Sequence, residues 1–344
     1  MPAAPIVVEN LSKTFQVARR QSGFSASVRH FFRRETEDVH AVRDATFTVE
    51  RGEFVGVLGK NGAGKTTILK MLAGLIHPTS GKASVLGQNP FRRNRAHLKR
   101  ISLVMGNRQQ LIWDLPAQDS YRIHAALYGL DDDKVKKRVH ELAEMLLLEE
   151  KNLAQPVRKL SLGQRMKAEL VAALLHEPEV LFLDEPTLGL DVSVQRALRD
   201  FLRTYNEETE ATVLLTSHYM ADVTALCPRI LLFQDGALSY DGGLQTFLDD
   251  KAPHRLVELS LSAGVSDEAL KEIGVFTREG EQVCFQVPRE EIASVTAVLL
   301  ARYESSDLTV RDIDVDDIVR DAFSEASALQ DDNEAVTEKT ETAT

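Results

Sequence analysis

The sequence has 344 residues, more than one typical domain needs, and 43% of them are hydrophobic, which is enough for real cores. A net charge of −11 argues against a general polyanion binder, so no nucleic-acid partner is expected. The two cysteines, Cys227 and Cys284, lie far apart without metal-ligand spacing, which favours a reducing compartment. No apolar run approaches the roughly 20 residues of a membrane-spanning helix, and no secretory signal is expected at the start.

The chain begins with an apolar stretch, 6–11, that is expected to form an edge strand. A basic insertion follows at about 16–38, with no acidic residue between Arg19 and Arg34 and with phenylalanines at helical spacing. This pattern fits a short amphipathic helix that docks on a membrane surface or a partner. It fits equally well a solvated insertion that packs on its own domain. Residues 41–49 then alternate with period two and predict a strand.

Residues 59–67 read Gly-Lys-Asn-Gly-Ala-Gly-Lys-Thr-Thr and fit the phosphate-binding loop G-x-x-x-x-G-K-[ST]. Stretch 54–58 predicts a buried strand before it, and 67–73 predicts a helix after it, whose positive end faces the anion. Lys65 is expected to reach the β- and γ-phosphates, and the Thr66 hydroxyl to bind Mg²⁺. The residues expected to hold the nucleotide here are Gly59, Asn61, Gly62, Ala63, Gly64, Lys65, Thr66 and Thr67.

Further apolar runs at 101–105, 180–183 and 213–215 predict strands of a parallel sheet that is buried on both faces. Helical spacing fills about 120–150, with a second helix expected to start at Asp131-Asp132-Asp133, and 230–238 resembles a hairpin. The run 180–183 ends in two carboxylates. Beside a phosphate-loop strand, Asp184 is expected near the Mg²⁺, and Glu185 one residue further toward the γ-phosphate.

The composition changes near 249–253. Beyond that point the patterns predict, in order, strand, helix, strand, strand, helix and strand between 256 and 312, with a last helix at about 315–326. This order predicts a small α+β domain over 255–326. The segment 327–344 is rich in Asp, Glu, Thr and Ala and is expected to be a disordered acidic tail.

Three further motifs follow the phosphate loop: Leu-Ser-Leu-Gly-Gln at 160–164, Leu-Gly-Leu-Asp at 188–191 and Thr-Ser-His at 216–218. In this order they resemble the signature, D-loop and switch histidine of the ATP-binding-cassette (ABC) ATPases, with Leu162 in place of the usual first glycine. The resemblance covers about 5–245 and implies an α/β P-loop nucleotide-binding domain with a helical subdomain at about 115–178. It also implies that two copies close head to tail on two ATP molecules. Residues with implied roles are Glu185 and His218 in catalysis, and Ser161, Gly163, Gln164 and Asp191 in nucleotide binding.

Two positions of the family pattern stay open. The amide that the family places after the strand at 101–105, linked to Mg²⁺ and water, is either Asn107 or Gln110. The aromatic residue on which adenine stacks is Phe15, with the region of His40 as the second choice.

The insertion and Trp-Asp-Leu-Pro at 113–116 are similar to ATPase subunits of ABC-2-type exporters, such as drug or viologen exporters. The resemblance implies a motor subunit that uses ATP and Mg²⁺, forms a homodimer and drives a separate ABC-2-type permease. It would lie peripherally on the cytoplasmic side of the plasma (inner) membrane. The alternatives are the ATPase of a polysaccharide or lipid-linked glycan exporter, and a soluble ABC ATPase that is not a transporter.

Overall fold

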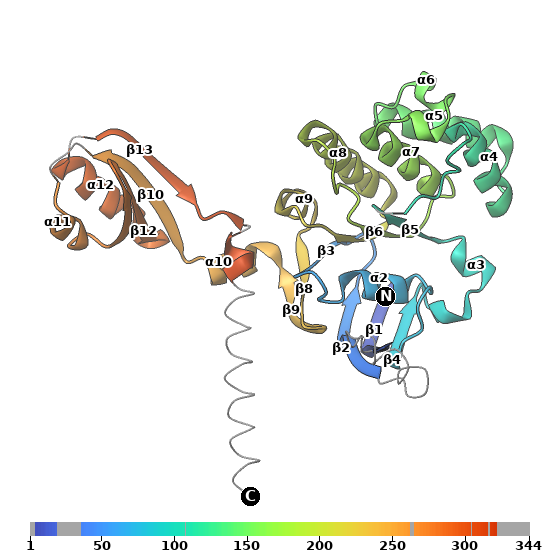
Figure 1. Ribbon diagram of the computed structural model, residues 1–344, viewed down its shortest axis with the longest axis horizontal. Helices are drawn as coiled ribbons and strands as arrows, with labels where there is room; N and C mark the ends of the chain where they lie inside the picture. The colour runs from blue at the N-terminus through green and yellow to red at the C-terminus, as the bar shows by residue number, and fades with distance from the viewer. Residues whose placement is uncertain are drawn as a thin grey trace, which may run out of the picture. The chain divides into compact units, whose positions relative to one another are not determined.

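The computed structural model describes residues 4–18, 36–106, 108–261, 265–303, 305–315 and 317–321 (Figure 1). Most of the basic insertion, Asn107 and the expected acidic tail lie outside these ranges. The chain divides into two compact units, Met1–Gly243 and Leu244–Thr344. No helix among the described residues has the length and apolar character required to cross a bilayer.

The first unit is built on a nine-stranded sheet with the order β4-β1-β2-β9-β8-β3-β7-β6-β5. The five strands β8, β3, β7, β6 and β5 run parallel, and their side chains are almost all buried, as expected for strands covered on both faces. The strands are β1 (Ile6–Ala18), β2 (Thr36–Val49), β3 (Phe54–Gly59), β4 (Ser80–Val85), β5 (Ile101–Met105), β6 (Val180–Asp184), β7 (Thr212–Thr216), β8 (Arg229–Gln234) and β9 (Ala237–Gly243).

The expectation that the first strand lies at an edge is wrong. β1 pairs with β2 on one side and with β4 on the other, so that Ile6 lies opposite both Val49 and Val85. Ile6 and Val8 are fully buried, and two neighbouring strands provide the cover that these side chains need. The strand at this edge of the sheet is therefore β4, whose first residues are exposed.

Helix α2 (Lys65–Leu72) lies between the parallel strands and the β1–β2–β4 layer, as Figure 1 shows. Its buried side chains, Ile68, Leu69, Met71 and Leu72, pack in one core cluster with residues of both layers. The curled sheet thus wraps the helix that follows the phosphate loop. This burial anchors the loop from its carboxyl-terminal side.

Helices α4, α5 and α7 pack against one another in this unit, and the Tyr121 hydroxyl of α4 donates to the Ala168 carbonyl of α7 at 3.1 Å. Helix α5 begins where expected, because the Asp131 carboxylate accepts the Asp133 and Lys134 amides as an N-cap. The helices and 3₁₀ turns are η1 (Pro90–Arg92), α3 (Arg95–Leu98), α4 (Ala117–Tyr128), α5 (Asp132–Met145), α6 (Glu150–Leu153), η2 (Val157–Lys159), α7 (Leu162–Leu174), α8 (Val192–Thr209) and α9 (Met220–Leu226).

The second unit has four antiparallel strands in the order β11-β12-β10-β13, with two helices between them along the chain. This is the split β-α-β arrangement, and it confirms the small α+β fold expected from the sequence. Inward-facing Val257, Leu259, Val283 and Phe285 pack with Leu270 and Leu299 of the helices. Its elements are α10 (Leu244–Lys251), β10 (His254–Leu261), α11 (Asp267–Lys271), β11 (Val275–Glu279), β12 (Gln282–Pro288), η3 (Arg289–Glu291), α12 (Ile292–Arg302) and β13 (Ser305–Asp312).

Candidate nucleotide-hydrolysis site

The phosphate loop connects β3 to α2 at the carboxyl end of the parallel strands. Gly64 precedes the helix with φ 100°, and a Cβ there would lie 2.2 Å from the Ala41 carbonyl oxygen of β2. Gly62 also has positive φ, at 86°, but the space above it is open. Glycine is therefore required at position 64 for two reasons, backbone conformation and the close approach of β2. The close approach of β2 cannot be predicted from the residues around position 64.

Lys65 is buried, and its ammonium group is held over the loop. The Nζ donates to the Gly59 carbonyl at 2.6 Å and to the Lys60 carbonyl at 3.0 Å. Burial lowers the pKa of Lys65, while the nearby carboxylates of Glu185 and Asp184 act in the opposite direction. The cation thus lies where the loop amides and an incoming phosphate anion would meet.

Thr66 and Asp184 lie side by side. The Thr66 hydroxyl is 2.9 and 3.0 Å from the two carboxylate oxygens of Asp184, and the Thr216 hydroxyl donates to the same carboxylate at 2.8 Å. These hard oxygen donors fit Mg²⁺, which takes one or two protein oxygens and completes its shell with water and phosphate. No group of three or more His, Cys, Asp or Glu with the geometry of a metal site occurs in the described part of the chain. Thr216 also belongs to this cluster, although its place before Ser217 and His218 in the sequence did not indicate a separate role for it.

Glu185 and His218 contact each other directly, with 2.8 Å between Glu185 Oε1 and His218 Nε2. Glu185 has φ 55°, an uncommon backbone conformation for a glutamate. Its amide donates to the Thr216 carbonyl at 3.0 Å, and a Cβ at Gly106 would lie 2.3 Å from its carbonyl oxygen. Neighbouring β7 and the turn after β5 thus hold the residue in a conformation that costs about 1 kcal/mol or more, as strained residues at functional sites do.

The signature residues form the start of α7. The Ser161 hydroxyl accepts the Gln164 amide at 3.2 Å, and the Gln164 side chain accepts the Ser161 amide at 3.0 Å, which makes a capping box. A Cβ at Gly163 would lie 3.0 Å from Val194 of α8, so this glycine is fixed by packing. Leu162, by contrast, is 39% exposed and carries its side chain without displacing α8.

Asp191 ends the D-loop and caps α8. Its carboxylate accepts the Ser193 hydroxyl at 2.6 Å and the Val194 amide at 3.0 Å. These hydrogen bonds, that of Ser193 foremost, lower the pKa of Asp191 and keep the exposed side chain charged. The role in nucleotide binding expected for Asp191 stays a prediction.

The two open positions are not decided. The Gln110 side-chain nitrogen donates to the Leu103 carbonyl of β5 at 2.9 Å, and Asn107 is outside the described residues. Phe15 and His40 both lie on the paired β1 and β2 strands, near the Ala41 carbonyl that approaches Gly64. The Lys13 ammonium lies 4.9 Å from the Phe15 ring centroid, and His40 Nδ1 is 3.0 Å from the Thr14 hydroxyl.

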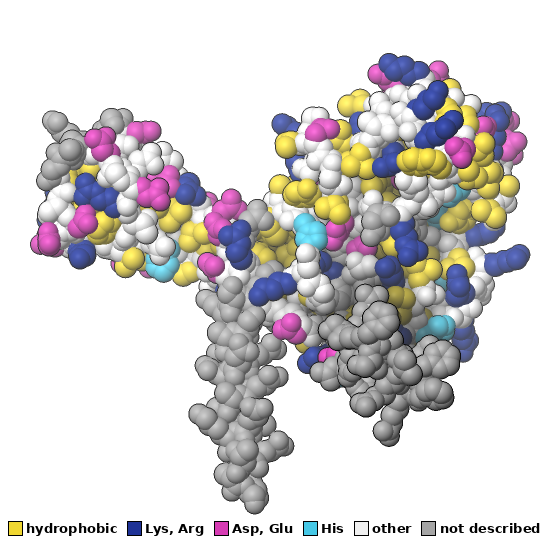
Figure 2. Space-filling view, in the orientation of Figure 1, with side chains coloured by type: hydrophobic (Ala, Val, Ile, Leu, Met, Phe, Trp, Pro, Cys, Tyr) yellow, Lys and Arg dark blue, Asp and Glu magenta, His cyan; other side chains and the backbone are white. Residues whose placement is uncertain are grey.

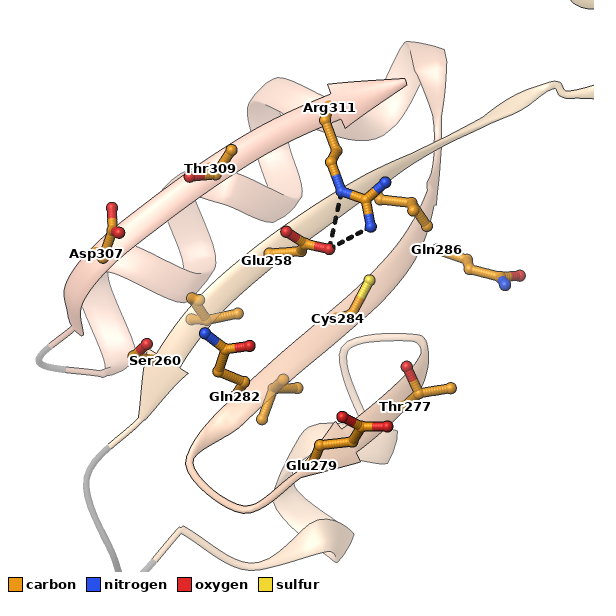
Figure 3. Close-up of a pocket in the computed structure, with 13 residues that line it drawn as sticks. Glu258, Ser260, Thr277, Glu279, Gln282, Cys284, Gln286, Asp307, Thr309 and Arg311 are labelled. Carbon is orange, nitrogen blue, oxygen red and sulfur yellow. Dashed lines mark hydrogen bonds and ion pairs between the residues drawn. The ribbon is translucent and has the colours of Figure 1, made fainter. Parts of the chain in front are cut away.

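A separate pocket of about 450 Å³ lies on the open face of the sheet in the second unit. Figure 3 shows Arg311 and Glu258 pointing toward each other across it, with Cys284 beside them. The guanidinium contacts the carboxylate at 2.6 and 2.9 Å, and this pair lowers the pKa of Glu258. Most other lining side chains are polar, as on the solvated face of an antiparallel sheet.

Comparison with known proteins places this site in a family. Residues 42–188 match the family model described as "ABC transporter", and residues 253–311 match "EvrA-like ABC transporter, C-terminal domain". The chain is 32% identical over 231 residues to the ABC transporter ATP-binding protein NatA of Bacillus subtilis, covering 67% of this chain and 93% of that protein. It is also 32% identical over 265 residues to Nod factor export ATP-binding protein I of Burkholderia lata, covering 77% and 76%.

Solved structures agree with this assignment. An ATP-binding subunit of an ABC transporter aligns with a TM-score of 0.58 at 26% identity, covering 71% of this chain and 92% of that one. A dimeric ATP-binding cassette in a post-hydrolysis state, bound to ADP and Pi, has the same fold with a TM-score of 0.57 at 24% identity, covering 70% and 98%. The fold and the site define a P-loop nucleotide-binding protein. The chain belongs to the ABC transporter ATP-binding proteins, and it is an ATPase of that family with an EvrA-like C-terminal domain.

Proposed function

We propose that this protein is the ATP-hydrolysing motor subunit of an ABC-2-type exporter and that it drives a separate membrane-embedded permease. The arrangement of Lys65, Asp184 and Glu185 around the phosphate loop supports hydrolysis. Several relatives, 32–34% identical, are named for Nod factor export, which supports export; one relative, 31% identical over 230 residues, is named for methionine import. The protein would act peripherally on the cytoplasmic side of the membrane.

Each chemical role has a place in this site. Loop amides and Lys65 would bind the β- and γ-phosphates, and Thr66 and Asp184 would hold Mg²⁺, which neutralises phosphate charge when bound. Glu185 would accept a proton from the attacking water, and His218 would orient that water and hold the γ-phosphate. The 2.8 Å contact between Glu185 and His218 holds these two side chains next to each other in the site.

A second copy would complete the site. The Ser161 turn carries a helix N-terminus, and such an end attracts the charge of a γ-phosphate. Two chains that close head to tail would each supply this turn to the other, and both sites would hydrolyse ATP. ATP would therefore hold the closed dimer, and hydrolysis would release it.

The partner of the motor is proposed to dock on the helical part of the first unit. Ile112, Trp113, Leu115, Ile123 and Leu127 are large exposed hydrophobic residues on or just before α4. Figure 2 shows hydrophobic side chains among charged ones over this part of the molecule. Exposed apolar patches of this kind mark protein interfaces, and a permease supplies a partner for it.

The decisive experiment is Glu185→Gln in the full chain. The amide keeps the size of the side chain but accepts no proton, so ATP turnover should fall by about 100-fold or more while nucleotide affinity is retained. Steady-state hydrolysis and equilibrium binding of ATP measure the two effects.

Glu177→Gln is the matched control. Glu177 also has positive φ, at 51°, but its side chain is exposed and forms an ion pair with Arg138 at 3.8 Å. Turnover of this variant should equal that of the wild type. Wild-type turnover in Glu185→Gln would refute the proposed catalytic site.

A further inference from the structure

Asp222 of α9 is a buried carboxylate to which the proposed reaction gives no role. It is only 1% exposed, and its Oδ2 accepts the Thr187 hydroxyl at 2.5 Å and the Ser217 hydroxyl at 2.8 Å. Its Oδ1 accepts Arg199 Nη1 at 2.8 Å, in an ion pair whose arginine is 14% exposed. A buried charge with this many partners fixes the position of every group that donates to it.

The donors come from the segments that carry the proposed chemistry. Thr187 is two residues after Glu185, Ser217 immediately precedes His218, and Arg199 lies in α8, which Asp191 caps. The Ser217 hydroxyl also accepts the Tyr219 amide at 3.0 Å, so the turn around His218 is bonded on both sides. One carboxylate thus joins the exits of β6 and β7 to the helix that follows the D-loop.

We propose that Asp222 is a positioning residue for ATP hydrolysis, which holds the Glu185 and His218 segments in register through Thr187 and Ser217. This inference rests on the proposed function of Glu185. Glu185 stands in a strained backbone conformation, and such conformations persist only where surrounding bonds over-determine them. Arg199 neutralises the buried charge and extends the connection to α8. Asp222 itself contacts neither phosphate nor water in the reaction.

The test is Asp222→Asn in the full chain. The amide retains one acceptor and turns an NH₂ group toward either the two hydroxyls or Arg199, so the network loosens. Turnover should fall by about 10- to 100-fold, as for a small misplacement of reacting groups, while the KM for ATP changes by less than about 3-fold. A role confined to stability would lower the melting temperature and leave the turnover of folded protein unchanged.

A triple variant separates positioning from an independent effect. If Asp222 acts through Glu185 and His218, adding Asp222→Asn to a chain that already carries Glu185→Gln and His218→Ala should not reduce the residual single-turnover rate further. An equal fractional loss in that background and in the wild type would overturn the inference, and so would wild-type turnover in folded Asp222→Asn. Wild-type turnover in Glu185→Gln alone would instead overturn the proposed function. Failure of the proposed function can therefore be told apart from failure of the inference about Asp222.

Two other variants keep the test decisive if Asp222→Asn does not fold. Thr187→Val preserves shape and removes one hydrogen bond, and it should reduce turnover in the same direction by a smaller factor. Unchanged turnover in that variant would count against the inference.

Asp241→Asn is the control, because Asp241 also accepts an arginine, Arg229, at 2.8 and 2.9 Å but lies in the β8–β9 hairpin. That substitution should leave turnover unchanged.

Discussion

Among single residues, Glu169 shows how a buried charge can tie two functional segments together. It lies inside α7, and its carboxylate accepts the Gln110 amide at 2.9 Å and the Leu111 amide at 3.3 Å. The loop after β5 is thereby bonded to the helix that starts at Ser161. Since α4 and its exposed apolar residues follow that loop, Glu169 links the segment that leads to the proposed permease surface with the helix that the signature turn begins.

Glu169 also gives a pH prediction. Burial raises the pKa of Glu169 above the ordinary 4.5. The two backbone hydrogen bonds and Arg165 act in the opposite direction, but their effect is smaller. Between 4.5 and the raised value, the folded protein binds more protons than the unfolded chain, so the free energy of unfolding falls as pH rises through that window. Each unit of the shift corresponds to about 1.4 kcal/mol.

Glu169→Gln removes this titration. The stability of the wild type relative to the variant should be greatest below pH 4.5 and decline to a constant as pH rises. Urea unfolding of both proteins over a pH series measures the difference, in which the other titrating groups cancel. A pH-independent difference would contradict the assignment of the raised pKa to Glu169.

At the scale of elements, the start of α7 serves both the fold and the proposed reaction. Ser161→Ala removes the N-cap and should lower the free energy of unfolding by about 1 kcal/mol. It should also reduce ATP turnover by about 10-fold or more, because the hydroxyl is proposed to face the γ-phosphate of a second copy. Thermal melting and steady-state hydrolysis give the two readouts.

Ser266→Ala is the matched cap variant. Ser266 caps α11 by accepting the Ala269 amide at 3.4 Å, in the second unit. Its loss should have a similar or smaller cost in stability and leave turnover unchanged. If Ser161→Ala behaved in the same way, the Ser161 turn would have no part in hydrolysis.

Elements with local signals were predictable from the sequence. Glycine spacing marked the phosphate loop, Asp131 marked the start of α5, and the residue patterns between 256 and 312 marked the order of strands and helices in the second unit; the structure has all of these elements. Long-range contacts left no such signal. The pairing of β1 with β4, the approach of Ala41 to Gly64 and the convergence of Thr187, Ser217 and Arg199 on Asp222 all join segments far apart in the chain.

For the whole molecule, the proposed cycle needs a surface on which two copies close. Leu162 of the signature turn, Leu188 of the D-loop and Val192, which follows the D-loop, are 39%, 43% and 76% exposed. A Cβ on Gly189 would lie 3.3 Å from Leu162 Cδ2, so the two motifs present apolar atoms side by side. Exposed apolar groups on the signature turn and the D-loop favour burial against a second copy.

This surface predicts an ATP-dependent dimer. Full-length Glu185→Gln should sediment as a dimer with ATP and as a monomer with ADP, because the triphosphate is retained at the shared site. Adding Val192→Asp should weaken the dimer by about 10-fold or more, since it places a charge in an apolar contact. Val192 is the first residue of α8, where an acidic side chain interacts favourably with the helix dipole, so the fold should be unharmed.

Leu147→Asp is the control: Leu147 is equally exposed at 76%, and its left-handed backbone accepts aspartate. That variant should dimerise like its parent, and an equal loss in both variants would show that general surface charge, not this face, controls association.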